Sequence, residues 1–310
     1  MAASVVIDTH ELARTFKKVR AVDGLTLSIH PGELFGLVGP DGAGKTTTLR
    51  LLAGLLGVSD GQATVLGFDL QHESESIKPH IGYMAQQFSL YGELTVLQNL
   101  SFFSELFDVS APDFNERSRR LLDFAGLADF KYRRAANLSG GMQKKLALAC
   151  TLIHQPEILL LDEPTTGVDP VSRREFWNIL TDLHIQGTTI LVSTPYMDEA
   201  DRCSRVGLLY AGRLITCDTP QHIRATLEGQ VIEVRPDDWH AAMQVLRPLA
   251  GVRAVQAYGE ALHLLVDSGE ERLPQVLAAL EQAHISCGSI RLAPPRMEEA
   301  FFSMIQELEA

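Results

Sequence analysis

The chain has 310 residues, of which 45% are hydrophobic and 21% charged, and its net charge is −12. The length suits two domains, and the composition is that of a globular protein, which excludes a disordered or fibrous chain. The acidic balance opposes binding to nucleic acid or to an anionic membrane surface, so a polyanionic ligand would need a local positive site.

Two features of the sequence indicate whether the protein spans a membrane or is secreted. The longest apolar stretches, such as 51–58 and 158–161, fall far short of the ~20 residues that span a bilayer. The first positive charges follow a short mixed segment instead of preceding an apolar one, which is unlike a secretory signal. We therefore expect no membrane-spanning helix and a cytoplasmic location.

The first part of the chain predicts strands followed by a helix. Short β-rich runs at 4–8 and 25–29 precede a strand that ends in LFGLVGP, and a glycine-rich turn leads into a helix over 46–56. One apolar face of that helix is formed by Leu49, Leu52, Ala53 and Leu56. Further strands are expected at 81–84, 158–161, 189–193 and 206–210. Their continuous apolar runs indicate strands buried on both faces, as in a parallel sheet between helices.

The pattern changes twice along the chain. Between about 87 and 155 it becomes helical, which predicts an inserted helical subdomain. After about residue 217 it predicts strand, helix, strand, strand, helix, strand, the order of a ferredoxin-like unit. All seven lysines lie at or before Lys145, and residues 218–310 hold 7 Arg against 14 Asp and Glu. We therefore expect two domains, 1–220 and 221–310.

A glycine-rich loop lies where the predicted strand turns into the helix. The sequence GPDGAGKT fits the phosphate-loop pattern G-x-x-x-x-G-K-[ST] in the required context. Glycines let backbone N–H groups converge on phosphate oxygens, while Lys45 neutralises charge and Thr46 offers a hydroxyl to Mg²⁺. The expected nucleotide contacts are Gly39, Pro40, Asp41, Gly42, Ala43, Gly44, Lys45, Thr46 and Thr47.

Two carboxylates end another buried strand. In ILLLDEP, Asp162 would hold Mg²⁺ and Glu163 would polarise the attacking water, the division of labour that phosphoryl transfer requires. An Asp-Glu pair alone is more often a solvated turn. Its position after four apolar residues, in a chain with a phosphate loop, favours the catalytic interpretation.

A third motif, LSGGMQKK, predicts the start of a helix. Ser139 is the expected N-cap, and Gly140 and Gly141 in the first turn leave N–H groups bare for an anion. Behind it we expect a buried stripe of Met142, Leu146, Ala149 and Ile153.

Together, the phosphate loop, LSGG and LLLDEP, in that order and with a helical insertion after the first, resemble the ATP-binding subunit of ATP-binding cassette (ABC) transporters over residues 1–220. The implied fold is an α/β P-loop NTPase with a helical subdomain, followed by a small α+β ferredoxin-like domain. The resemblance also implies that Phe16 stacks on the adenine. It implies that Gln86 is a catalytic, Mg²⁺-contacting glutamine that reports nucleotide state to the membrane subunit. Asp169 is implied to be the aspartate that reaches across the dimer interface. Thr46 and Asp162 complete the implied metal site.

The C-terminal unit, ending in PRMEEAFFSMI, resembles that of the ABC-2 exporter branch, which includes daunorubicin-type drug-resistance ATPases. The resemblance implies a magnesium-dependent, membrane-associated multidrug-efflux ATPase. Two such subunits sandwich two ATP molecules and act on a separate transmembrane permease at the inner face of the cytoplasmic membrane. The stretch 97–107 has two interpretations, a docking surface for that permease or plain core packing. The C-terminal domain is expected to serve regulation or dimerisation.

The sequence departs from the family pattern at two positions. Pro195 stands where a histidine would contact the γ-phosphate, and proline has neither a side-chain donor nor a backbone N–H. Asp41 replaces an asparagine, either as a neutral turn substitution or as an extra negative charge near the phosphates. We hypothesise that the chain's own site binds ATP but hydrolyses it slowly, in a heterodimer with a complete ATPase. In the alternative, another group replaces the histidine and a homodimer works normally.

Other function classes also remain open. A soluble cassette protein could use the same ATP clamp on a ribosome or on DNA, although the acidity and the lack of a basic stripe oppose this. A catalytically silent, regulatory nucleotide-binding subunit is a third alternative. The transported substrate is not encoded in these motifs.

Overall fold

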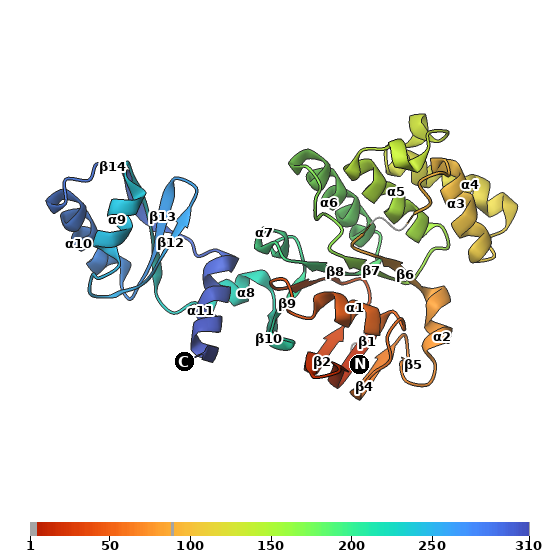
Figure 1. The fold of residues 1–310 in the computed structure, drawn as a ribbon, viewed down its shortest axis with the longest axis horizontal. Coiled ribbons are helices and arrows are strands. Elements are labelled where there is room, and N and C mark those ends of the chain that lie inside the picture. The colour runs from red at the N-terminus through yellow and green to blue at the C-terminus, as the bar shows by residue number, and fades with distance from the viewer. Residues whose placement is uncertain (1–4, 88–89, 310) are drawn as a thin grey trace. The chain divides into compact units, whose positions relative to one another are not determined.

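The computed structural model describes residues 5–87 and 90–309 (Figure 1). The chain forms two compact units that adjoin in sequence at Thr219 and Pro220, and each unit has its own hydrophobic core. The division falls within one residue of the boundary expected at 220.

The first unit contains an antiparallel sheet in the order β2-β1-β4-β5. Its strands are β1 (Ile7–Phe16), β2 (Val19–Ile29), β4 (Asp60–Val65) and β5 (Phe68–Asp69). Ser4, where a strand was expected to begin, lies outside the described residues. The sequence patterns predicted β1 and β2 as much shorter strands and did not predict β4 and β5. The reason is that one face of this sheet is partly solvated, so its strands carry polar residues.

A second sheet of the first unit has the order β10-β9-β3-β8-β7-β6. Its strands are β3 (Leu34–Val38), β6 (Ile81–Met84), β7 (Ile158–Asp162), β8 (Thr189–Thr194), β9 (Arg205–Tyr210) and β10 (Arg213–Asp218). Only β10 pairs antiparallel within it. Every residue of β3, β7 and β8 is buried, as their apolar runs predicted. The carboxyl ends of the parallel strands therefore meet at one edge, where open α/β sheets place their ligands.

Helices of the first unit flank this sheet (Figure 1). They are α1 (Lys45–Leu52), α6 (Pro170–Ile185) and α7 (Met197–Ala200), whereas the short α2 (Ser74–Ile77) contacts β5 of the antiparallel sheet. Helix α1 is shorter than expected because Gly54, with φ of 65°, ends it in the left-handed conformation. Leu56 consequently lies beyond the helix and is only partly buried, whereas Leu49 and Leu52 are fully buried.

The expected helical insertion contains α3 (Val96–Leu106), α4 (Ala111–Phe124) and α5 (Gly140–Leu152). Leu100 of α3 and Leu146 of α5 belong to a shared core. Met142 was predicted to be buried with Leu146, but it is only partly buried and packs against the margin of that core. On α3, Phe102 and Leu106 are exposed, so this helix contributes both to the core and to the surface.

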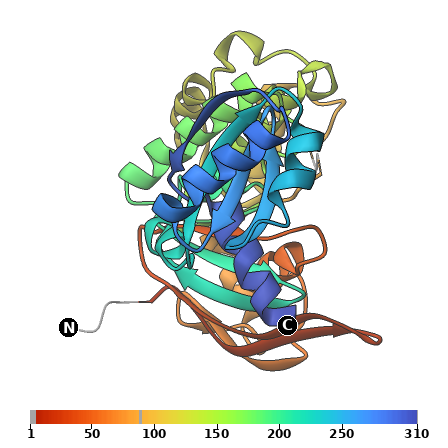
Figure 2. The ribbon, with the colours of Figure 1, turned by 90° about the vertical axis from the view of Figure 1, so that its left-hand side faces the viewer.

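The second unit is an antiparallel sheet in the order β12-β13-β11-β14 with helices across it (Figure 2). Its elements are α8 (Pro220–Ala225), β11 (Gln230–Pro236), α9 (Trp239–Leu246), β12 (Val252–Tyr258), β13 (Ala261–Val266), α10 (Gly269–Gln282), β14 (Cys287–Ala293) and α11 (Met297–Glu309). The succession from β11 to β14 is the predicted βαββαβ order. Helix α11 was not identified as an element from the sequence.

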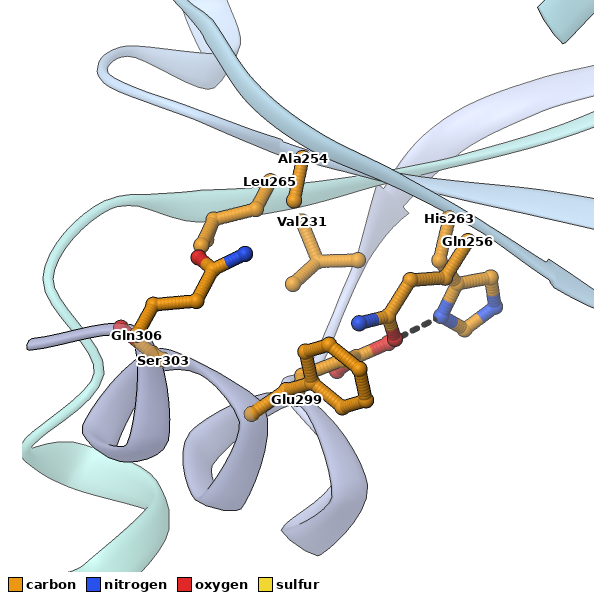
Figure 3. A pocket seen from close by; sticks show the side chains of 9 residues that line it. Val231, Ala254, Gln256, His263, Leu265, Glu299, Ser303 and Gln306 are labelled. Atoms are coloured by element: carbon orange, nitrogen blue, oxygen red, sulfur yellow. Dashed lines mark hydrogen bonds and ion pairs between the residues drawn. The ribbon is translucent and has the colours of Figure 1, made fainter. Parts of the chain in front are cut away.

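Buried polar groups attach α11 to the sheet of the second unit. His263 of β13 hydrogen-bonds through Nδ1 to Glu299 of α11, as Figure 3 shows. The other ring nitrogen lies 3.4 Å from Glu233 of β11, which also accepts from Arg291. These contacts join α11 directly to β13 and, through His263, to β11.

Among the described residues, no helix is both long enough and apolar enough to cross a membrane.

Candidate active site

The phosphate-loop residues connect β3 to α1. Lys45 is almost fully buried, and its Nζ donates to the backbone carbonyls of Gly39 at 2.8 Å and Pro40 at 3.0 Å. Gly44 has φ of 102°, and a Cβ there would come within 2.4 Å of the Ala21 carbonyl oxygen. The loop therefore requires glycine at this position, as the pattern predicted. The first N–H groups of α1 have no intrahelical acceptor and are available to an anion.

Asp162 ends β7 beside α1 and is fully buried. Its Oδ1 accepts hydrogen bonds from the hydroxyls of Thr46 and Ser193, both at 2.9 Å. The hydroxyl of Tyr83 lies 3.4 Å from Oδ2. Hydroxyl and carboxylate oxygens are the protein ligands that Mg²⁺ prefers, so this donor set fits a magnesium ion.

Glu163 follows Asp162 in a strained conformation, with φ of 43°, and is 5% exposed. Its Oε1 lies 3.1 Å from the Nζ of Lys45. Its Oε2 accepts from Gln86 Nε2 at 2.8 Å and from the Thr166 hydroxyl at 3.2 Å. Left-handed backbone at a non-glycine residue costs about 1–3 kcal/mol and is concentrated at functional sites. The strain and the three contacts fix one position for this carboxylate.

Gln86 lies just beyond β6. Its side chain contacts Glu163. The other two expected metal ligands, Thr46 and Asp162, contact each other. The backbone carbonyl of Gln86 accepts a hydrogen bond from Lys144 of α5. Burial lowers the pKa of Lys144. The negative charges of Asp162 and Glu163 act in the opposite direction, but the effect of burial is larger.

The LSGG motif begins α5. The hydroxyl of Ser139 caps the helix by accepting from the N–H of Met142 at 3.3 Å. A Cβ on Gly140 would meet nothing within 4 Å, so this part of the turn is open. A Cβ on Gly141 would lie 2.4 Å from the hydroxyl of Ser172. Gly141 is thus required for packing against α6, a role that the sequence interpretation did not assign.

Asp169 is the exposed N-cap of α6. Its Oδ1 accepts from the N–H groups of Val171 at 3.1 Å and Ser172 at 3.0 Å. Hydrogen bonds from Ser172 lower the pKa of Asp169 below its usual value. Since Gly141 also packs against Ser172, the first turns of α5 and α6 are neighbours.

Pro195 directly follows β8. The preceding residue, Thr194, accepts a hydrogen bond from the N–H of Gly39 through its carbonyl at 3.3 Å. The neighbouring Ser193 contacts both Asp162 and the N–H of Glu163. The two residues that precede Pro195 therefore contact the phosphate loop and the two carboxylates.

Phe16 and Asp41 lie apart from these contacts. Phe16 ends β1 with 40% of its surface exposed, and the guanidinium of Arg14 lies 4.7 Å from its ring centre. Asp41 is exposed in the phosphate loop. The close cluster thus comprises Lys45, Thr46, Gln86, Asp162 and Glu163.

Sequence reasoning missed Glu199, which lies on α7 and is 1% exposed. Its carboxylate accepts from Thr165 at 2.7 Å, Thr194 at 2.5 Å and Arg173 at 2.6 Å. It therefore joins the loop after Glu163 to the end of β8. The polar Ser193 and Thr194 at the end of a fully buried strand were the available signal for such a partner.

Residues 22–166 match the family described as "ABC transporter". The chain is 34% identical to the daunorubicin/doxorubicin resistance ATP-binding protein DrrA of Streptomyces peucetius, over 96% of this chain and 92% of that protein. It is 46% identical to the probable multidrug ABC transporter ATP-binding protein YbhF of Escherichia coli over 71% of this chain, and spans only 38% of that protein's length.

A solved structure shows the same fold in the first unit. It is a dimeric, post-hydrolysis state of an ATP-binding cassette bound to ADP and phosphate, with a TM-score of 0.63 and 26% identity. The match covers 69% of this chain and 98% of that one.

Proposed function

Because this chain belongs to the ATP-binding proteins of ABC transporters, we propose that it is the ATP-hydrolysing subunit of an ABC-2 type exporter and drives a separate transmembrane permease. The observation that carries the proposal is the cluster of Lys45, Thr46, Asp162 and Glu163 at the end of the parallel strands. This cluster combines a phosphate-binding cation, a metal-binding pair and a fixed carboxylate.

The relatives support export as the direction of transport. The resistance protein DrrA and a Nod factor export ATP-binding protein from Rhizobium meliloti both align with nearly the whole chain. A cassette that acts on a ribosome or on DNA is therefore not favoured. We propose multidrug efflux as the class of transport.

Each residue of the cluster has a proposed part in the reaction. The loop 39–47 and Lys45 bind the phosphates of ATP, and Phe16 stacks on the adenine. Thr46 and Asp162, with Gln86, would hold Mg²⁺, which would supply positive charge to neutralise the phosphates of ATP. Glu163 orients and polarises the attacking water, because its Oε atoms are already held in place by Lys45 and Gln86.

We propose that two ATPase subunits close head to tail over two nucleotides. In this arrangement Ser139, Gly140 and Gly141 offer the open N-terminus of α5 to the nucleotide on the partner subunit, and Asp169 crosses the dimer interface. Such a pair is a two-state switch, because contacts to ATP from both subunits exist only in the closed state. The exposed Phe102 and Leu106 of α3 would dock the permease at the inner face of the cytoplasmic membrane.

Pro195 leads us to propose slow hydrolysis at the chain's own site. The two residues before it contact the phosphate loop and Glu163, and proline itself offers no hydrogen-bond donor. Losing one positioning contact reduces a rate by about 10²–10³ with little loss of binding. Pairing with a different, complete ATPase subunit would make one of the two sites productive.

We assign the second unit to regulation or dimerisation, since it has its own core and sheet. Truncation at residue 220 should leave ATP binding intact and change the oligomeric state or turnover. Loss of ATP binding on truncation would contradict that assignment.

The function is tested by measuring MgATP binding and turnover of the purified chain and of Lys45→Ala. We expect the wild type to bind MgATP and Lys45→Ala to bind at least about tenfold more weakly, because the buried phosphate-binding cation is removed. Failure of the wild type to bind MgATP would refute the proposal. Co-purification with membranes only when a permease is co-expressed would support the exporter assignment.

A further inference from the structure

Lys144 reaches from the helical segment to the candidate active site. It lies on α5, one turn after the LSGG glycines, and its Nζ donates to the backbone carbonyl of Gln86. The side chain of the same glutamine donates to Glu163 at 2.8 Å. A continuous series of hydrogen bonds therefore runs from α5 to the carboxylate proposed to polarise water.

The charges around Lys144 suit this position. The side chain is partly buried, and both Asp162 and Glu163 attract it electrostatically. Lys45 contacts Glu163 from the phosphate loop at 3.1 Å. Two lysines from different parts of the first unit thus balance two adjacent carboxylates.

The position of Gln86 depends on contacts from other elements of the fold. It follows β6 in a connecting segment, and connecting segments are more mobile than the strands they leave. A hydrogen bond to its main chain restricts where its side chain can place Nε2. Small displacements of a group that orients a reactant reduce rates strongly, so such a restriction has a kinetic consequence.

We propose that Lys144 is a positioning residue that fixes Gln86 and, through it, Glu163. The inference rests on the proposed ATPase function and adds a residue to it. Because α5 begins with Ser139 and the two glycines, Lys144 also connects the surface offered to the partner's nucleotide with the chain's own catalytic carboxylate. A displacement of α5 is thereby transmitted to Glu163.

Three variants test this role. Lys144→Met removes the charge and the donor, and Lys144→Arg keeps both. Lys145→Met is the matched control, because the adjacent Lys145 pairs with Glu175 of α6 at 2.8 Å instead of contacting Gln86. We expect Lys144→Met to lower single-turnover hydrolysis about tenfold while the Kd for MgATP stays within about threefold. Lys144→Arg and Lys145→Met should remain close to the wild type.

Hydrogen exchange of the backbone around Gln86, measured without nucleotide, provides a readout that does not depend on turnover. Exchange should be faster in Lys144→Met than in the wild type and in Lys145→Met, and Lys144→Arg should restore slow exchange. Equal hydrolysis rates in Lys144→Met and the wild type would overturn the proposal. If wild-type turnover is too slow to measure, equal exchange rates overturn it. A wild type that does not bind MgATP would refute the proposed function, while the exchange data would still decide on Lys144.

Discussion

Gln86 and Glu163 are joined by a hydrogen bond of 2.8 Å between the amide nitrogen of one and a carboxylate oxygen of the other. The second oxygen of Glu163 faces Lys45 at 3.1 Å. The carboxylate therefore lies between a group that follows β6 and a group of the phosphate loop. This arrangement couples the position of the proposed general base to nucleotide binding, because phosphates would compete for Lys45.

Glu163→Gln should abolish turnover and keep ATP binding. A carboxamide preserves shape but cannot accept a proton, and general-base catalysis contributes about 10²–10⁴ in rate. Parallel measurements of MgATP affinity and phosphate release check this. Turnover within about threefold of the wild type would exclude Glu163 from that role.

Thr46→Ala should weaken binding of MgATP more than binding of ATP in the presence of a chelator. The substitution removes the hydroxyl that contacts Asp162 and would ligate the metal. Titrations with and without Mg²⁺ separate the two affinities. An equal loss under both conditions would place Thr46 outside the metal site.

Gly140→Ala and Gly141→Ala form a matched pair. Only the second substitution places a Cβ against Ser172, so we expect it to lower the free energy of unfolding by about 1–3 kcal/mol. Gly140→Ala should leave stability unchanged or slightly higher, since Ala is the better helix residue, but it should weaken ATP-driven dimerisation by crowding the open turn. Chemical denaturation and sedimentation measure the two effects. Equal destabilisation by both substitutions would contradict the packing role of Gly141.

Glu199→Ala should destabilise the first unit by about 1–3 kcal/mol, because two hydroxyls lose their buried acceptor while Arg173 keeps its hydrogen bonds to Asp198. Glu199→Gln, which retains acceptor capacity, should cost less. Urea denaturation gives both values. A loss below about 1 kcal/mol for the alanine variant would show that these contacts are replaced by others.

The sequence predicted best what is fully buried. Continuous apolar runs identified β7 and β8, and glycine and lysine spacing identified the phosphate loop, since both patterns follow from local requirements. The long β1 and β2 were underestimated because their alternating polar residues resemble those of loops. Gly54 ended α1 early, although its neighbours continue the apolar pattern.

Contacts between distant elements were beyond the reach of sequence patterns. Nothing local in LSGGMQKK indicates that Lys144 reaches Gln86, 58 residues earlier in the chain. The packing of Gly141 on Ser172 and the three partners of Glu199 likewise depend on how helices pack on the sheet. The residue types in the sequence predicted which residues form the candidate site. The contacts between those residues could be identified only from the folded structure.

In the proposed function, the chain's own site binds ATP and Pro195 limits its hydrolysis. The most direct measurement compares Kd for MgATP and turnover in the wild type and in Pro195→His. We predict an unchanged Kd and a turnover at least about tenfold higher in Pro195→His, because the imidazole supplies a donor beside the phosphate loop. Rapid wild-type turnover that the substitution leaves unchanged would contradict this role of Pro195.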